Sequence, residues 1–267
     1  MGRFDSLGQR KVVLGMVHLQ PLPGTPFHRS GTFSEILRTA VESARSLQAG
    51  GADGCLVQTV DRVYTTGEDS DPARTSALAL IVNAIVAATD EDFQVGVQVM
   101  ANALKASLAV AKVAGGTYIR AGAVVGATMS SYGLIEAHPH EVMTYRRSID
   151  AADIKVIAEV DSMHYRWLGA GKSTAEVAGS ARRVGADAVA VSHPEESVML
   201  DMIASVKDAV PDLPVILAGN TTHENAARLV AAADGAFVGT CLESGGWGGQ
   251  IDVEKVKAYV DIVRSLE

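Results

Sequence analysis

Short apolar segments alternate with longer amphipathic stretches along the whole chain. Eight of the short segments are rich in Val, Ile, Leu and Ala and have the length of buried strands; they cover 11–18, 53–58, 93–99, 117–122, 154–160, 187–192, 213–219 and 234–240. Stretches with a helical spacing of apolar residues follow them, at 34–51, 72–88, 102–116, 141–152, 173–186, 195–209, 222–233 and 252–266. Strict alternation of strand and helix predicts parallel strands joined by helical crossovers.

Three similar segments lead into predicted strands: GGADGCLV (50–57), VGADAVAV (184–191) and AAADGAFV (231–238). Their recurrence indicates one structural solution for the end of a helix and the turn into the next strand. No linker, low-complexity tract or shift in composition divides the chain. We therefore predict an α/β fold with one domain, a (β/α)8 barrel over residues 1–267. A doubly wound open sheet is the alternative, but no G-x-G-x-x-G turn follows the first strand.

The composition fits a folded, enzyme-sized domain and narrows the choice of partners. The chain has 267 residues, of which 48% are hydrophobic and 20% are charged, and its net charge is −8. We do not expect so acidic a chain to bind nucleic acid through a broad cationic surface, and no apolar run is long enough to predict a membrane span. Cys55 and Cys241 lack the spacing of a metal site, which favours a reducing, cytoplasmic location. We also expect a homo-oligomer, since acidic, well-cored barrels often self-associate.

The candidate site follows from the rule that barrel chemistry lies at the C-terminal ends of the strands and in the loops after them. In KVVLGMVHLQPLPGTP (11–26) the first strand ends at His18, and the prolines stiffen the following loop. We expect His18 to line the site; the alternative is a core histidine that is satisfied within the protein. The other polar residues at or just beyond predicted strand ends are Gln58, Gln98, Asn102, Arg120, Glu159, Asp161, His164, Ser192, Asn220 and Thr240.

Strand parity predicts that two carboxylates share one face. Glu159 and Asp161 are two residues apart, so both should point toward the barrel axis with Ile157. Paired carboxylates can divide acid and base roles or hold a divalent cation. The structural alternative is an ion pair between one of them and Arg120 on the neighbouring strand. No H-x-H or H-x-x-x-H spacing supports a metal, so we predict no cofactor and keep a divalent cation only as the lesser alternative.

The seventh and eighth predicted strands end in PVILAGN and DGAFVGT, and each supplies a glycine. In many barrels a phosphate binds between the loops after these strands, through backbone N–H groups. Gly219 and Gly239 allow the close backbone approach that such binding needs, and Thr240 could donate from its side chain. The alternative is that both are ordinary turn glycines.

The connection GAVVGATMSSYGLIEAHPHE (122–141) is the longest after any predicted strand. A long connection without clear periodicity is typical of a lid or a binding loop. Glu136 and His140 could reach the barrel mouth from it, so both are candidate binding residues. His138 and His140 form an H-P-H pair, but the intervening proline and the lack of a third placed ligand argue against a metal site.

Several motifs make the sequence recognisable: GMVHLQPLPGTP, IRAGAVVGA followed by GLIEAHPHEVMTYRRSI, IKVIAEVDSMH, and PVILAGNTTHENAARLVAAADGAFVGTCLE. With them the chain resembles the BtpA/SgcQ family of bacterial TIM barrels over nearly its whole length. The resemblance implies a barrel of the ribulose-phosphate-binding group. It defines the reaction poorly, since one member is named for photosystem I biogenesis and others belong to sugar metabolism with nucleosidase-type assignments.

The chain departs from the family pattern at several mouth positions. VQTVDR has Gln58 where an acid is expected, and QVMAN keeps Asn102 but has Ala101 in place of an arginine. AEVDSMH retains His164 but differs from the family at both carboxylate positions. We therefore expect a divergent member whose chemistry can differ from that of its relatives.

Two functions compete on the sequence alone. The first is an enzyme that acts on a small phosphorylated sugar or nucleoside-like substrate, by proton-transfer isomerisation or N-glycosidic cleavage. In it Glu159 or Asp161 is the general base, Arg120 stabilises negative charge, and His18 donates a proton or orients the substrate, with His164 nearby. The second is a non-catalytic assembly or biogenesis factor that retains the barrel, which the changes at positions 58 and 101 favour.

Overall fold

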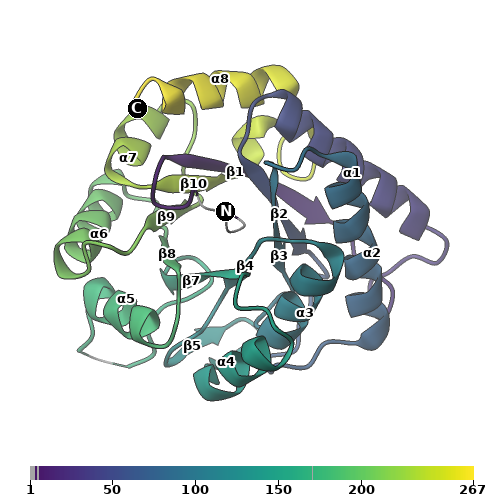
Figure 1. Ribbon diagram of the computed structural model, residues 1–267, viewed down its shortest axis with the longest axis horizontal. Helices are drawn as coiled ribbons and strands as arrows, with labels where there is room; N and C mark the ends of the chain where they lie inside the picture. The colour runs from purple at the N-terminus through teal and green to yellow at the C-terminus, as the bar shows by residue number, and fades with distance from the viewer. Residues whose placement is uncertain (1–3, 5, 170) are drawn as a thin grey trace.

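Eight parallel strands close into a barrel in the computed structural model, which describes residues 4, 6–169 and 171–267. The strands are β1 (Val12–Leu19), β2 (Gly54–Thr59), β3 (Gln94–Gln98), β4 (Tyr118–Ala121), β7 (Lys155–Asp161), β8 (Ala188–Val191), β9 (Val215–Ala218) and β10 (Gly235–Val238). Their order around the barrel is β1-β10-β9-β8-β7-β4-β3-β2 (Figure 1). Every strand lies within two residues of its predicted segment, and the predicted (β/α)8 fold is confirmed.

Helices form an outer layer around the strands (Figure 1). They are α1 (Phe33–Ala49), α2 (Pro72–Ala88), α3 (Leu104–Ala114), α4 (Pro139–Ser148), α5 (Thr174–Arg183), α6 (Glu196–Ala209), α7 (Ala226–Ala232) and α8 (Val253–Arg264). Side chains fix three of the starts: Asp71 and Asp252 accept hydrogen bonds from the first N–H groups of α2 and α8, and Ser173 and Glu176 form a capping box on α5. Within the described ranges, none of the helices is long and apolar enough to cross a bilayer.

Three helices begin two or more residues from the predicted start. α3 begins at Leu104 rather than at 102. α4 begins at Pro139 rather than at 141, because the fixed φ of proline suits the first helical turn. α7 begins at Ala226 rather than at 222. The Asn225 side chain accepts a hydrogen bond from the N–H of Thr222 (2.7 Å) and closes a separate turn before the helix.

Two short antiparallel pairs have no periodic signal in the sequence. β5 (Ala127–Ser130) and β6 (Gly133–Glu136) form a hairpin inside the long connection 122–141. β11 (Glu243–Ser244) and β12 (Gln250–Ile251) follow the 3-10 helix η1 (Thr240–Leu242). Strands of two to four residues are too short for alternation to be recognised.

Apolar side chains fill the barrel interior below the C-terminal ends of the strands. Met16, Leu56, Ile157 and Phe237 belong to this cluster, together with Tyr118 from β4. Gly96 makes room for the tyrosine, since a Cβ at position 96 would lie 2.1 Å from the Tyr118 ring. The Tyr118 hydroxyl donates a hydrogen bond to the carbonyl of Cys55 (2.7 Å). The interior is therefore a packed core that supports whatever lies at the C-terminal rim.

The three Gly-Ala-Asp-like segments do share one structural solution, and the aspartate provides it. In each, the carboxylate accepts a hydrogen bond from a backbone N–H at the start of the neighbouring strand. The pairs are Asp53 with Val13 (2.7 Å), Asp187 with Val156 (2.9 Å) and Asp234 with Val215 (2.8 Å). Each carboxylate also meets a cation from an outer helix: Arg264 (2.7 Å), Arg146 (3.2 Å) and Lys207 (3.0 Å), respectively. The repeated aspartates thus fasten strands to helices at the N-terminal end of the barrel.

We expect Asp53→Asn to lower the free energy of unfolding by about 2 kcal/mol, because the amide has only one acceptor oxygen: one hydrogen bond from Arg264 is lost, and the other no longer reaches a charged acceptor. Asp153→Asn is the matched control, since Asp153 pairs with Lys112 on the surface and should have little effect. Urea denaturation followed by circular dichroism measures both. Equal midpoints for the two variants would contradict the proposed fastening role.

Candidate functional site

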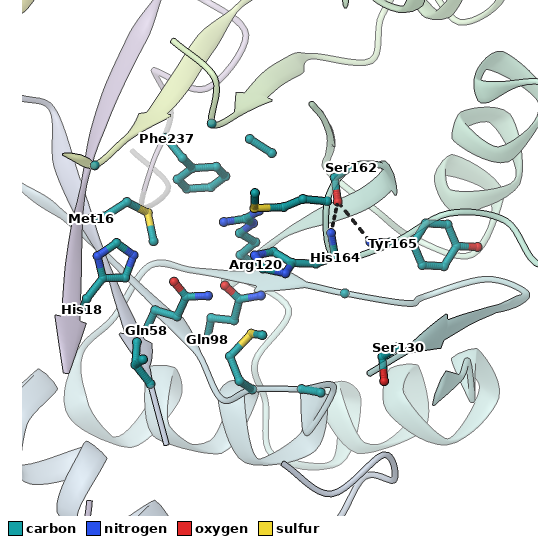
Figure 2. A pocket seen from close by; sticks show the side chains of 18 of the residues that line it. Met16, His18, Gln58, Gln98, Arg120, Ser130, Ser162, His164, Tyr165 and Phe237 are labelled. Atoms are coloured by element: carbon teal, nitrogen blue, oxygen red, sulfur yellow. Dashed lines mark hydrogen bonds between the residues drawn. The ribbon is translucent and has the colours of Figure 1, made fainter. Parts of the chain in front are cut away.

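A cavity of about 910 Å³ opens at the C-terminal ends of the barrel strands (Figure 2). Ten of the residues singled out from the sequence line it: His18, Gln58, Gln98, Asn102, Arg120, His164, Gly219, Asn220, Gly239 and Thr240. The others do not. The barrel therefore gathers most of the candidates from seven separate strand ends into one concave space.

Strand register explains why polar side chains from different strands meet. His18 is paired with Gln58 across β1 and β2, and Gln58 with Gln98 across β2 and β3. Neighbours in a parallel register point to the same face, and the inward positions just below them, such as Met16 and Leu56, belong to the barrel core. Figure 2 shows the two amides side by side with Arg120 close by. The interior thus turns from apolar to polar at its last layer.

The floor of the cavity has hydrogen-bonding groups without partners. Gln98 is 2% exposed, and neither its amide nitrogen nor its amide oxygen has a partner among the described residues. The same is true of Nη2 of Arg120, which is 4% exposed. Buried polar groups in proteins are normally hydrogen-bonded. Unpartnered groups that face a cavity are therefore candidate contacts for a ligand.

Glu159 lies beneath the cavity and does not line it. Its side chain is fully buried, with Oε1 3.0 Å from Nε of Arg120, and its other oxygen accepts a hydrogen bond from the Ser162 hydroxyl. Arg120 also lies over the ring of Phe237, 5.1 Å from the ring centre. This is the ion pair that the sequence left as the structural alternative. Glu159 holds Arg120 in place and has no surface on which to act as a general base.

The prediction that Asp161 shares a face with Glu159 is wrong. The register between β7 and β8 shifts between these two residues, as at a β-bulge, and an extra residue breaks the two-residue alternation. Asp161 instead accepts a hydrogen bond from the Thr174 hydroxyl at the start of α5 (3.0 Å) and lies 3.9 Å from Nε of Arg166. It is outside the cavity lining.

Three other candidates also lie outside the cavity lining. Glu136 ends β6 and His140 lies in the first turn of α4, and both are exposed. The connection folds into a hairpin, which carries these two residues away from the mouth. Ser192 is buried and accepts a hydrogen bond from the Asn220 amide (2.8 Å), so it supports Asn220 from behind.

His164 is a cavity histidine whose pKa is affected by the charges of Arg120 and Glu159. Its backbone N–H donates to the Ser162 hydroxyl (3.1 Å), as does that of Tyr165. The ring remains accessible from the cavity, yet the protein atoms around it remove enough water to lower its pKa below 6.5. Arg120 lowers this pKa further, while Glu159 opposes the shift. A lowered pKa keeps the ring neutral and able to accept a proton at pH 7.

His18 has a carboxylate neighbour that the sequence reasoning missed. Oε1 of Glu243 lies 3.7 Å from Nδ1 of His18, and the other oxygen accepts a hydrogen bond from the N–H of Gly248 (2.6 Å). The Trp247 ring stands 5.6 Å from the imidazole, between ring centres. Glu243 lies beyond the last strand, next to a glycine-rich loop, so strand counting did not reach it.

Arg74 is a second residue that the sequence reasoning missed. It is the only charged residue in helix α2, whose other residues are mostly apolar, and this is the signal that could have revealed it. Its guanidinium contacts Oδ2 of Asp61 (2.6 Å), the Thr59 hydroxyl (2.7 Å) and the carbonyl of Met100 (2.6 Å). Arg74 therefore ties the loops after β2 and β3 together behind the cavity wall.

Asn102 lines the cavity but has both amide groups engaged. Its nitrogen donates to the carbonyl of Ala123 (3.1 Å), and its oxygen accepts from the N–H of the same residue (2.8 Å). These bonds fix the loop after β4. On the other side, the β5–β6 hairpin walls the cavity, and the Tyr132 hydroxyl donates to the carbonyl of Arg62 across the mouth (3.0 Å).

Gly219 and Gly239, which follow β9 and β10, form one corner of the cavity, where the backbone is not covered by a side chain of its own. Gly219 has φ of 107° and Asn220 has φ of 57°, and a Cβ on Gly219 would meet only the Ser192 hydroxyl, at 4.0 Å. Gly239 faces β1, since a Cβ there would lie 3.5 Å from Cε1 of His18. Within the part of the chain that the structure describes, no group of three or more His, Cys, Asp or Glu side chains is arranged to hold a metal ion.

The comparisons with known proteins agree with this architecture. The BtpA family profile matches residues 9–265. Photosystem I biogenesis protein BtpA of Synechocystis is 30% identical, covering 98% of this chain and 91% of the relative. Among solved structures, a Mycobacterium tuberculosis tryptophan synthase aligns with a TM-score of 0.62 at 16% identity, covering 96% of this chain and 94% of that one. The 2-keto-3-deoxy-6-phospho-gluconate aldolase of Zymomonas mobilis aligns with a TM-score of 0.55 at 16% identity, covering 98% and 97%. The solved structures share the fold, and the sequence matches show that this chain belongs to the BtpA family.

Proposed function

We propose that this chain is an enzyme that binds a small phosphorylated sugar or a nucleoside-like relative of one, and transfers a proton to or from it. The observation that carries the proposal is the floor of the cavity. The side chains of Gln98 and Arg120 are buried and line the cavity, and the Gln98 amide and Nη2 of Arg120 have no partner among the described residues. Keeping such groups unpaired is unfavourable for folding, so a bound substrate is the natural partner for them.

In this proposal His164 takes the general-base role that we predicted for Glu159 or Asp161, and His18 keeps its predicted role as proton donor. His164 follows β7 and His18 lies in β1 next to its last residue, and these strands are on opposite sides of the closed barrel. A substrate in the cavity therefore passes between the two rings. His164, whose pKa is lowered, accepts the proton. His18, beside Glu243, donates one on the other face. Proton-transfer isomerisation and N-glycosidic cleavage both suit this pair.

The open corner at Gly219 and Gly239 is the proposed phosphate site. It lies after the last two barrel strands, where backbone N–H groups bind phosphate in many barrels. The name of the Zymomonas aldolase, which contains a phosphorylated sugar acid, supports a phosphorylated substrate. None of the described side chains that line the cavity is a lysine, so the site offers no amine for a covalent Schiff base.

Inorganic phosphate at millimolar concentration should raise the melting temperature above that in chloride of equal ionic strength, because a ligand stabilises the state that binds it. Gly219→Val should abolish this response by filling the corner. Gly31→Val is the matched control, since Gly31 also has positive φ (82°) and open space around a Cβ but lies outside the cavity lining. Differential scanning fluorimetry measures the shift. An identical response to phosphate in wild type and Gly219→Val would rule out this corner.

The name of the Synechocystis relative supports a second candidate function, an assembly or biogenesis factor. Under that function the cavity still binds a ligand but turns nothing over. Incubating each sugar phosphate that raises the melting temperature with the protein, and following it by NMR, separates the two functions. Conversion by wild type at a rate that His164→Gln abolishes would decide for the enzyme.

We place the protein in the cytoplasm, in keeping with its two free cysteines, and we propose that it self-associates. Leu80 on α2 and Val113 on α3 are apolar side chains that such an interface would cover, since they are 57% and 75% exposed.

A further inference from the structure

We infer that the floor of the cavity binds two adjacent hydroxyl groups of the substrate, a vicinal diol, rather than a carboxylate. The inference rests on the proposed function and specifies its substrate class: a sugar phosphate with a free diol at the end remote from the phosphate. It is carried by the hydrogen-bonding capacity, the charge and the position of Gln98 and Arg120.

The unpartnered groups on the floor include both donors and an acceptor. The Gln98 nitrogen and Nη2 of Arg120 can each donate, while the Gln98 oxygen needs a donor from the ligand. A carboxylate accepts hydrogen bonds but donates none, so it would leave that oxygen unsatisfied. A hydroxyl group both donates and accepts. Two neighbouring hydroxyls therefore satisfy the whole set.

The charge of the floor also favours a neutral ligand group. Arg120 is already paired with the fully buried Glu159, 3.0 Å away. The pair is formally neutral, and Gln58 and Gln98 beside it carry no charge. A carboxylate on this floor would introduce a second negative charge close to Glu159, where there is little water to screen it. A diol introduces none.

The strand order places the floor opposite the proposed phosphate corner. β3 and β4, which carry Gln98 and Arg120, are separated from β9 and β10 by half of the closed barrel in either direction. A substrate that spans the mouth thus has its phosphate at one end and its diol at the other. His18 and His164 flank the carbon atoms between them. Pentose and hexose phosphates phosphorylated on the terminal carbon have this arrangement.

The test compares three probes by isothermal titration calorimetry on the full chain. Ribose 5-phosphate carries the diol, 2-deoxyribose 5-phosphate lacks one hydroxyl of it, and 3-phosphoglycerate carries a carboxylate instead. We expect ribose 5-phosphate to bind about tenfold more tightly than either analogue, because each analogue leaves a buried group unsatisfied. Gln98→Met should remove this preference while the response to inorganic phosphate remains. Gln94→Met, at the other end of the same strand, should keep the preference.

The outcomes separate this inference from the proposed function. If no probe and no inorganic phosphate binds, the proposed function itself fails. If phosphate binds but ribose 5-phosphate binds no more tightly than its deoxy analogue, the diol inference is overturned and the phosphate site stands. Tighter binding of 3-phosphoglycerate would overturn it as well. The comparison of probes on wild type decides the matter even if Gln98→Met does not fold.

Discussion

Replacing Arg120 with methionine is expected to lower the free energy of unfolding by about 3–5 kcal/mol. The substitution leaves the fully buried Glu159 without its cation, which lies 3.0 Å away in the native protein. An uncompensated carboxylate in this position is far more unfavourable than the loss of packing, because methionine fills much of the same volume over Phe237. Urea denaturation measured by tryptophan fluorescence and circular dichroism gives the change.

A double variant tests whether the unpaired charge is the cause. Arg120→Met combined with Glu159→Gln removes both charges and keeps a side chain that can bond to Ser162. It should regain most of the stability lost in the single variant. Arg228→Met, which breaks a bidentate surface pair with Glu196, should leave the unfolding midpoint unchanged within experimental error. A single and a double variant of equal stability would show that Glu159 is not held by Arg120 in the way described.

The barrel and the location of the site could be predicted because both depend on local signals. Strand segments, helix starts and the polar residue at the end of each strand are all visible in the sequence, and closing the barrel brings the strand ends together. The alternation of side chains along the strand correctly predicted that Glu159 points toward the barrel interior with Ile157. It failed for Asp161 two residues later, because a β-bulge depends on how two strands pair, and one strand's sequence does not contain that information.

The missed residues are those whose role depends on a distant partner. Glu243 comes from the connection after the last barrel strand, where the N–H of Gly248 donates to it, yet it meets His18 from the first strand, over 220 positions away in the chain. Arg74 lies on a helix and contacts two loops. Glu159 was predicted as a general base, but its partner decides its role: a carboxylate paired with a buried arginine positions that arginine and does not line the cavity.

The two ends of the barrel differ in how completely their buried polar groups are hydrogen-bonded. At the N-terminal end every repeated aspartate is satisfied by a backbone N–H and a helix cation. At the C-terminal end Gln98 and Arg120 keep polar groups without partners. Such unsatisfied groups reduce stability where they stand, and they persist in folds when a ligand completes them. This asymmetry supports our proposal that the cavity binds a substrate.

His164→Gln is expected to reduce kcat by about 10²–10⁴-fold with a small change in KM, because a positioned general base contributes about that much to a proton transfer. The side chain keeps its size and can still hydrogen-bond, but it cannot accept a proton at neutral pH. The assay follows conversion of a sugar phosphate that the thermal-shift and NMR experiments identify. His193→Gln is the matched control, since His193 lies in the loop after β8 and outside the cavity lining, and it should retain full activity.

The pH profile separates a base from a residue that only shapes the cavity. A general base works in its neutral form, so activity falls as the pH drops through its pKa. Burial lowers the pKa of His164 below 6.5, so wild type should keep its activity at pH values where an ordinary histidine is half protonated. In His164→Gln this acidic limb of log(kcat/KM) should disappear along with most of the rate. A variant that loses rate but keeps the limb unchanged would place the base elsewhere, with His18 as the remaining imidazole in the cavity.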